Sequence, residues 1–218
     1  MCRYNRTVKA SRSCRRRYPK CSRKRNRRCR YGRTCRRRQS SKGGALCPGS
    51  DDPYNIGGPN KRDNMIGRST FLIYRDVNDP TIVVKEIELP KWLPRAQVEA
   101  EFEYARRAGD LGVGPKVFYT TFCEINGKTV GYMVMEYIDG RTFQTTDMEN
   151  QEFVDQLNRL FEVMSENDMY YHDLHSQNVM VGRTSSDETE RVYLIDFGDI
   201  GPMRGRRPPT VNDIELLD

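Results

Sequence analysis

Hydrophobic residues from about residue 65 onward recur at two different periods, which predicts a domain that mixes strands and helices. Short runs rich in β-branched and aromatic residues fit strands, and they are 70–74, 81–87, 117–123, 129–137, 179–181 and 192–195. Asn126-Gly127 separates two of these runs and is a strong signal for a β-hairpin turn. Asn78-Asp79-Pro80 predicts another turn, between the first two strands.

Two helices are predicted between these strands. Pro94 fits the first position of a helix that runs to about Leu111, and Gly112 and Pro115 end it. Residues 146–149 form a capping-box pattern, which predicts the start of the second helix. Apolar residues at helical spacing predict its buried face: Phe153, Leu157, Leu160, Phe161 and Met164.

The first 44 residues differ sharply from the rest in composition. They hold 19 of the 37 Lys and Arg and none of the 30 Asp and Glu, which leaves 18 basic and 30 acidic residues elsewhere. Such a segment cannot bury enough apolar surface to offset the entropy of ordering, so we expect a disordered or extended basic arm over residues 1–44. The Gly- and Pro-rich residues 45–64 predict a linker, and 65–218 a folded domain.

Cysteine usage and hydropathy bear on location. Six cysteines lie in or just after the arm, at Cys2, Cys14, Cys21, Cys29, Cys35 and Cys47, and only Cys123 lies in the domain. No Cys-x-x-Cys pair occurs, which argues against zinc. No apolar stretch resembles a secretion signal or a membrane span, so we expect an intracellular protein with reduced thiols. Disulfides between chains in an oxidised particle are the alternative.

The candidate chemistry lies in two short motifs. Asp173 and Asn178 are five residues apart in the segment 171–180, and Asp196 opens Asp-Phe-Gly after an apolar run. This set fits phosphoryl transfer, in which one carboxylate accepts a hydroxyl proton while an Asn and an Asp hold Mg²⁺ against the phosphates of ATP. Asp173 is therefore the candidate base, and Asn178 and Asp196 are the candidate metal ligands.

These motifs and the order of elements resemble the protein-kinase-like fold over roughly residues 65–200. The resemblance is to small, divergent members, namely the Bud32-type and lipopolysaccharide-kinase-type families and kinase-like proteins of large DNA viruses. It implies an α+β, two-lobed fold, with an N-lobe at about 65–137 and a minimal C-lobe at about 138–218. Only 20 residues follow Gly198, and within them residues 212–218 predict the start of one helix.

The resemblance also implies the residues that bind ATP. Lys85, in Ile-Val-Val-Lys, would pair the α- and β-phosphates. Its acidic partner would be Glu99, Glu101 or Glu103, and the distance from the Gly-Val-Gly-Pro segment at 112–115 favours Glu101.

Three further positions concern the nucleotide. Backbone groups of Glu136 and Tyr137 would form the hinge that binds adenine. Gly67 is what remains of the Gly-rich loop, in which backbone amides cradle phosphates. Arg68 could add positive charge there.

The catalytic loop departs from the usual His-Arg-Asp pattern. Tyr171 and His172 precede Asp173, so control through a phosphate-reading Arg is not expected. His175 replaces the Lys of Ser/Thr kinases, and Asp-Leu-His is common in small-molecule phosphotransferases.

The arm resembles protamines and viral DNA-condensing peptides. Arg-rich arms bind nucleic acid without sequence preference through counterion release. A nuclear-localisation segment, or contact with an acidic surface of another protein, are the alternatives. Serines near Arg residues are candidate phosphorylation targets: Ser11, Ser13, Ser22, Ser40 and Ser41.

The sequence thus favours an ATP- and Mg²⁺-dependent phosphotransferase, most simply a Ser/Thr protein kinase, tethered to nucleic acid or a virion by its arm. Its location would be a virion or the host cytoplasm or nucleus. A catalytically inactive kinase-fold protein, associated with a capsid or with DNA packaging, is the first alternative. A small-molecule kinase is the second.

Overall fold

The computed structural model describes Cys47, residues 65–68 and residues 71–217, with only the backbone of Gly67 and Arg68. The chain divides between Lys42 and Gly43, and every described residue lies in the second unit. The predicted arm, its candidate serines and most of the predicted linker therefore lie outside the described residues.

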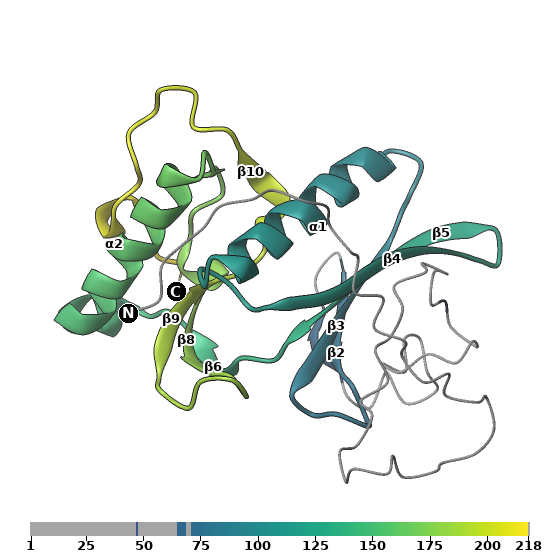
Figure 1. Ribbon diagram of the computed structural model, residues 1–218, viewed down its shortest axis with the longest axis horizontal. Helices are drawn as coiled ribbons and strands as arrows, with labels where there is room; N and C mark the ends of the chain where they lie inside the picture. The colour runs from purple at the N-terminus through teal and green to yellow at the C-terminus, as the bar shows by residue number, and fades with distance from the viewer. Residues whose placement is uncertain (1–46, 48–64, 69–70, 218) are drawn as a thin grey trace, which may run out of the picture. The chain divides into compact units, whose positions relative to one another are not determined.

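A five-stranded sheet forms the first half of the described domain (Figure 1). Its strands are β1 (Met65–Arg68), β2 (Leu72–Arg75), β3 (Ile82–Glu88), β4 (Val117–Ile125) and β5 (Lys128–Glu136). Their order across the sheet is β1-β2-β3-β5-β4, and all neighbours are antiparallel. The helix α1 (Arg95–Asp110) joins β3 to β4 and lies along one face of the sheet.

The second half contains the helix α2 (Gln151–Glu166) and two small sheets. One sheet has the order β6 (Asp139–Thr142), β8 (Val179–Arg183) and β9 (Arg191–Leu194). The other pairs β7 (Tyr170–Tyr171) with β10 (Ile200–Gly201). Single 3-10 turns complete it: η1 (Thr145–Glu149), η2 (Ser176–Asn178), η3 (Phe197–Asp199) and η4 (Val211–Asp213).

One hydrophobic core runs through both halves. It joins Val98 and Phe102 of α1 to Leu157 and Phe161 of α2 and to Leu194 of β9, all at most 3% exposed. Burial of this area is the main favourable term in folding, and here it fixes α1 against the segment that follows β9. The described domain is therefore mixed α+β, as the two periods in the sequence predict.

Several local predictions are confirmed. Asn126 and Gly127 form the turn between β4 and β5, both with the positive φ that such two-residue turns require. Gly112, with φ of 72°, follows the end of α1. Pro94 is the residue before α1 rather than its first residue.

The capping-box prediction for residues 146–149 is wrong. That segment lies in the 3-10 turn η1, where Asp147 and Gln144 form the capping box instead. Asp147 is also held by Arg141 through two hydrogen bonds of 2.5 and 2.6 Å. The second helix starts later, at Gln151, because the side chain of Asn150 accepts the backbone N–H of Glu152.

The predicted helix at residues 212–218 is also absent from the described part of that segment. Only the turn η4 forms there, and the chain then runs beside the loop at 173–178. Glu215 donates its backbone N–H to the carbonyl of Leu174 at 3.1 Å and accepts that of Ser176 at 2.9 Å. Backbone groups that a helix would use internally are thus used to brace the loop.

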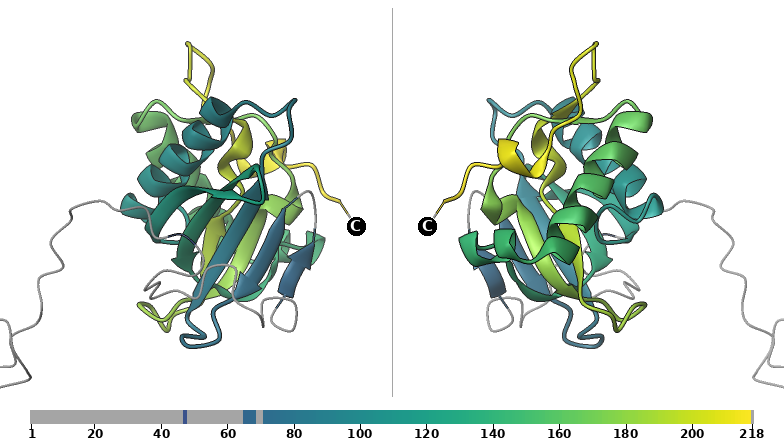
Figure 2. Two further views of the ribbon diagram at one scale, coloured as in Figure 1. Left: turned by 90° about the vertical axis from the view of Figure 1, so that its right-hand side faces the viewer. Right: turned by 90° about the vertical axis from the view of Figure 1, so that its left-hand side faces the viewer.

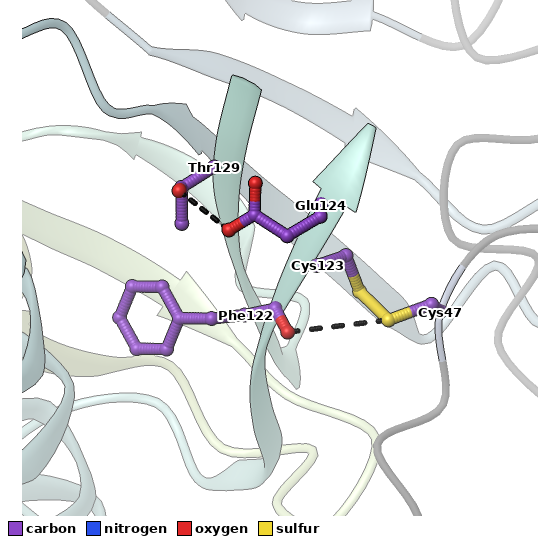
Figure 3. Close-up of a disulfide and its surroundings, with 5 residues drawn as sticks. All are labelled: Cys47, Phe122, Cys123, Glu124 and Thr129. Atoms are coloured by element: carbon purple, nitrogen blue, oxygen red, sulfur yellow. Dashed lines mark hydrogen bonds between the residues drawn. A yellow bond between two sulfur atoms is a disulfide. The ribbon is translucent and has the colours of Figure 1, made fainter. Parts of the chain in front are cut away.

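A disulfide joins Cys47 to Cys123 on β4, across 76 residues of chain, with Cα atoms 5.6 Å apart (Figure 3). The Sγ of Cys47 lies 4.0 Å from the carbonyl oxygen of Phe122. Cys123 is 2% exposed and belongs to an apolar cluster with Tyr74, Val84 and others, against which Cys47 packs. The expectation of reduced thiols is wrong for this pair, and the bond ties Cys47, within the predicted linker, to β4.

Among the described residues, no helix is both long and apolar enough to cross a membrane.

In buffer without reductant, replacing Cys47 with Ala should lower the free energy of unfolding by about 2–4 kcal/mol, because a long loop in the unfolded chain is no longer closed. Thermal denaturation with and without dithiothreitol measures this. Reductant should lower the melting temperature of the wild type and leave Cys47→Ala unchanged. Equal melting temperatures for both proteins without reductant would contradict the bond.

Candidate functional site

Lys85 lies between two carboxylates at the centre of the domain. Its Nζ is 2.7 Å from Oε1 of Glu101 and 2.9 Å from Oδ1 of Asp196. The three residues come from β3, from α1 and from the segment after β9, which the common core brings together. The side chains of Lys85 and Glu101 are 4% and 7% exposed, while that of Asp196 is 44% exposed. The open side of this group is therefore at Asp196.

The two carboxylates keep Lys85 charged despite its burial. Burial alone lowers the pKa of its ammonium, but Glu101 and Asp196 outweigh this and raise the pKa above its usual range. A buried charge is tolerated only with such partners. The site thus holds a buried, fixed cation at Lys85, and the exposed carboxylate of Asp196 lies between it and solvent.

The structure selects Glu101 among the three candidate glutamates. Glu99 pairs with Arg95 at 2.8 Å and Glu103 with Arg106 at 3.0 Å, both on the exposed side of α1. Glu101 shares the buried face of the helix with Val98, Phe102 and Ala105. These residues follow the i, i+3, i+4, i+7 spacing of one helix face, which directs Glu101 toward the sheet.

Asp196 has an unusual backbone conformation, with φ of 59° and ψ of 81°. Asp adopts this left-handed region more readily than most residues. The hydroxyl of Tyr171 hydrogen-bonds the carbonyl oxygens of Ile195 and Asp196, which holds the turn. Phe197 is buried next to the Tyr171 ring, with ring centres 6.1 Å apart.

Tyr171 acts here as a permanent donor. Burial, followed by the charge of Asp196, raises the pKa of its hydroxyl well above the usual value. The hydroxyl therefore keeps its proton at any physiological pH. The sequence shows Tyr171 only as a substitution for the usual His, and nothing local to it indicates contact with residues 24 and 25 positions later.

The loop at 173–178 holds Asn178 in one orientation. Its Nδ2 donates to the backbone carbonyl of Asp173 at 2.9 Å and lies 3.0 Å from Nε2 of His175. In the His175 tautomer whose Nε2 accepts, both amide protons are engaged and Oδ1 is the atom left to bind a ligand. Nε2 of His175 is also 3.4 Å from Oδ2 of Asp173, whose side chain is 61% exposed.

Asn178 and Asp196 lie at the same end of two paired strands. Asn178 precedes β8, and Asp196 follows β9 by two residues. The backbone N–H of Ile195 donates to the carbonyl of Asn178 at 2.9 Å, so the ladder continues to this point. An amide oxygen and an exposed carboxylate at one strand end are suitable Mg²⁺ ligands when phosphate oxygens complete the shell.

Within the described ranges, no group of three or more His, Cys, Asp or Glu side chains is placed to hold a metal ion.

The predicted hinge donors are already used by the protein. Glu136 donates its backbone N–H to the carbonyl of Lys116, and Tyr137 donates to that of Thr81, each at 2.8 Å. The Glu136 carboxylate is buried and accepts from the Ser186 hydroxyl at 2.6 Å. The expectation that both residues bind adenine is corrected to this extent: their N–H groups are committed, and only backbone carbonyls remain as acceptors.

Gly67 lies within β1, opposite Ile73, rather than in the turn after it. Residues 69 and 70 of that turn lie outside the described ranges. Phe71 follows them and places its ring 4.8 Å from Nζ of Lys85. The described side chain that covers Lys85 on this side is thus an aromatic ring, which the sequence motif did not identify.

A cavity of about 680 Å³ lies elsewhere in the domain. It is lined by the turn after α1, one face of α2, the loop between β8 and β9 and Glu136 of the predicted hinge, whereas Lys85, Asp173 and Asp196 do not border it. Its charged lining residues are largely paired with each other or with neighbours, as Arg191 is with Asp187 at 2.7 Å. The cavity therefore has no part in the arrangement around Lys85.

No protein-family model matches this chain, and the search of curated proteins found no similar sequence. The account of the site therefore depends on its own geometry.

Replacing Tyr171 with Phe should lower the free energy of unfolding by about 0.5–1.5 kcal/mol, because the carbonyl oxygens of Ile195 and Asp196 lose the hydroxyl proton that they share. Urea denaturation measures the change. Tyr104→Phe on α1 is the matched control: it keeps its ring near Arg107 and should change stability by less than about 0.5 kcal/mol. Equal effects of the two substitutions would contradict the role given to Tyr171.

Proposed function

We propose that the domain is an ATP- and Mg²⁺-dependent phosphotransferase with a two-lobed, protein-kinase-like fold. The observation that carries this proposal is the buried Lys85 bridging Glu101 and Asp196. A structural ion pair needs one acidic partner, whereas this lysine has two, and the second is an exposed carboxylate beside the Asp173–Asn178 loop. The ammonium of Lys85 suits phosphate oxygens, and the carboxylate of Asp196 suits a metal ion bound to those phosphates.

The arrangement of elements supports the same proposal. A five-stranded antiparallel sheet with one helix would form the first lobe, and α2 with the small sheets a reduced second lobe. The backbone bonds of Glu215 with Leu174 and Ser176 would support the catalytic loop from within this second lobe.

Each residue has a task in this mechanism. Lys85 would bind phosphate oxygens, held in place by Glu101. Oδ1 of Asn178 and the carboxylate of Asp196 would hold Mg²⁺, which neutralises charge on the phosphates. Asp173 would accept the acceptor's hydroxyl proton as that oxygen bonds to the γ-phosphorus. The bond to the bridging oxygen then breaks, and ADP leaves.

The basic arm would tether this domain to nucleic acid. Its support is composition alone: 19 positive charges and no negative ones in residues 1–44.

A structural protein on the same fold is the second candidate, and two observations favour it. The N–H groups of Glu136 and Tyr137 are unavailable to adenine. The Cys47–Cys123 disulfide is of a kind that persists in oxidising surroundings, such as a particle outside the cell.

Mg²⁺ and ATP together should raise the melting temperature of the wild type, since a ligand that binds only the folded state stabilises it. Asp173→Asn should keep this shift, because its side chain is exposed, and should reduce transfer from γ-labelled ATP to a mixed Ser/Thr peptide library by about 10²–10⁴-fold. Asp196→Asn should lose the Mg²⁺-dependent part of the shift.

The outcomes separate the two candidates. No shift and no transfer by the wild type would favour the structural protein. Equal transfer by wild type and Asp173→Asn would remove Asp173 from the mechanism.

A further inference from the structure

The loop between β10 and η4 carries three arginines within four residues: Arg204, Arg206 and Arg207. All three are exposed. In Figure 1 the loop leaves β10, and it is the yellow segment that stands out at the top of both views in Figure 2. The proposed phosphoryl transfer assigns it no role, so its charge and position need a separate explanation.

The backbone returns this loop to the catalytic residues. β10 pairs with β7 so that Ile200 faces Tyr171 and Gly201 faces Tyr170, which directs the chain away from Asp173. Arg204 and Gly205 then adopt positive φ values of 46° and 75° and reverse it. The backbone N–H of Arg206 donates to the carbonyl of Met203 at 2.9 Å and closes the turn.

Arg206 therefore lies at the edge of the catalytic loop. Its guanidinium donates to Nδ1 of His172 at 2.8 Å and lies 4.7 Å from the centre of the Tyr170 ring. His172 directly precedes Asp173, so their Cα atoms are about 3.8 Å apart. Contacts with a ring nitrogen and a π-face fix the guanidinium without neutralising it.

The nearby acids are engaged elsewhere or lie apart. Asp213 binds Arg207 through two hydrogen bonds of 2.5 and 2.9 Å. Asp168 accepts the backbone N–H of Met203 at 3.0 Å. Asp199 is exposed on η3, and its backbone carbonyl accepts the N–H of His172. No described carboxylate forms a salt bridge with Arg204 or Arg206.

We infer that Arg204 and Arg206 select protein acceptors with acidic residues near the target hydroxyl. This rests on the proposed function, because it places the hydroxyl at Asp173. An extended peptide advances by about 3.3 Å per residue. Because Arg206 contacts His172, the residue before Asp173, a hydroxyl at Asp173 would bring neighbouring residues of such a peptide toward Arg206 and the turn that carries Arg204. Guanidinium groups bind carboxylates and phosphates through paired hydrogen bonds.

The same charges disfavour the protein's own arm as a substrate. Its serines lie among arginines, as Ser13 and Ser22 show, and the arm has no acidic residue. Like charges brought together at a binding site reduce affinity for the wrong partner. The enzyme would then act on other, acidic proteins.

Steady-state transfer to serine peptides tests this, with Asp, phosphoserine, Arg or Ala placed two to five residues on either side of the acceptor. The wild type should prefer the Asp and phosphoserine peptides. Arg204→Gln should reduce that preference by about three- to fivefold, since exposed ion pairs are weak, and the double variant with Arg206→Gln should reduce it further. Arg204→Gln is the more specific variant, because Arg206 and not Arg204 contacts His172. Gln at this position must adopt the same positive φ as Arg204, so the substitution changes the charge and not the strain of the turn.

The matched control is the double variant Arg106→Gln/Lys128→Gln, which removes the same charge from α1 and β5. It should keep the preference of the wild type. Fluorescence anisotropy with labelled acidic peptide, at rising salt, measures binding without turnover. If the wild type binds the acidic peptide and Arg204→Gln does not, the inference is supported even where transfer is slow.

Failure of the inference differs from failure of the proposed function. An enzyme that transfers phosphate but prefers Arg peptides, or whose preference survives in the double variant, overturns the inference alone. Loss of oligonucleotide binding in Arg204→Gln, with unchanged peptide preference, would assign the loop to nucleic acid instead. An absent Mg²⁺–ATP thermal shift concerns the proposed function.

Discussion

The pairing of one buried ammonium group with two carboxylates is the constraint on which the rest of the structure depends. Lys85 leaves water only because Glu101 and Asp196 meet it, and an unpaired charge at that depth would cost several kcal/mol. The three elements that carry these residues, namely β3, α1 and the segment after β9, must therefore pack against one another. Tyr171 and Phe197 hold the segment after β9, and the common core packs α1 against it.

Much of this arrangement could be predicted from local patterns. The strands β2 to β5, β8 and β9, the Asn126-Gly127 turn and the buried face of α2 follow from hydrophobic period and turn chemistry, which act between near neighbours. The shorter strands β1, β6, β7 and β10 carry no such pattern and were not predicted. The choice of Glu101 followed from its distance to a Gly-Pro segment, and the burial of one face of α1 gives the physical reason. Lys85, Asn178 and Asp196 could be singled out because few residue types can bind phosphate or a metal ion, and these occur here in short recognisable motifs.

Other features depend on contacts between distant parts of the chain. Nothing near Cys47 or Cys123 in the sequence indicates that they meet. The start of α2 was misplaced because Arg141 takes Asp147 into a different turn. The hinge N–H groups of Glu136 and Tyr137 looked available until Lys116 and Thr81 were placed beside them. Such competition for a donor or a carboxylate cannot be read from spacing alone.

The bonds between Glu215 and the loop at 173–178 have a consequence for how the protein is made. Asp196 lies 111 residues after Lys85, and Glu215 follows later still. Contacts at such separation form slowly because a long loop must close first. On a ribosome, the growing chain would carry an incomplete site until this bracing segment emerges.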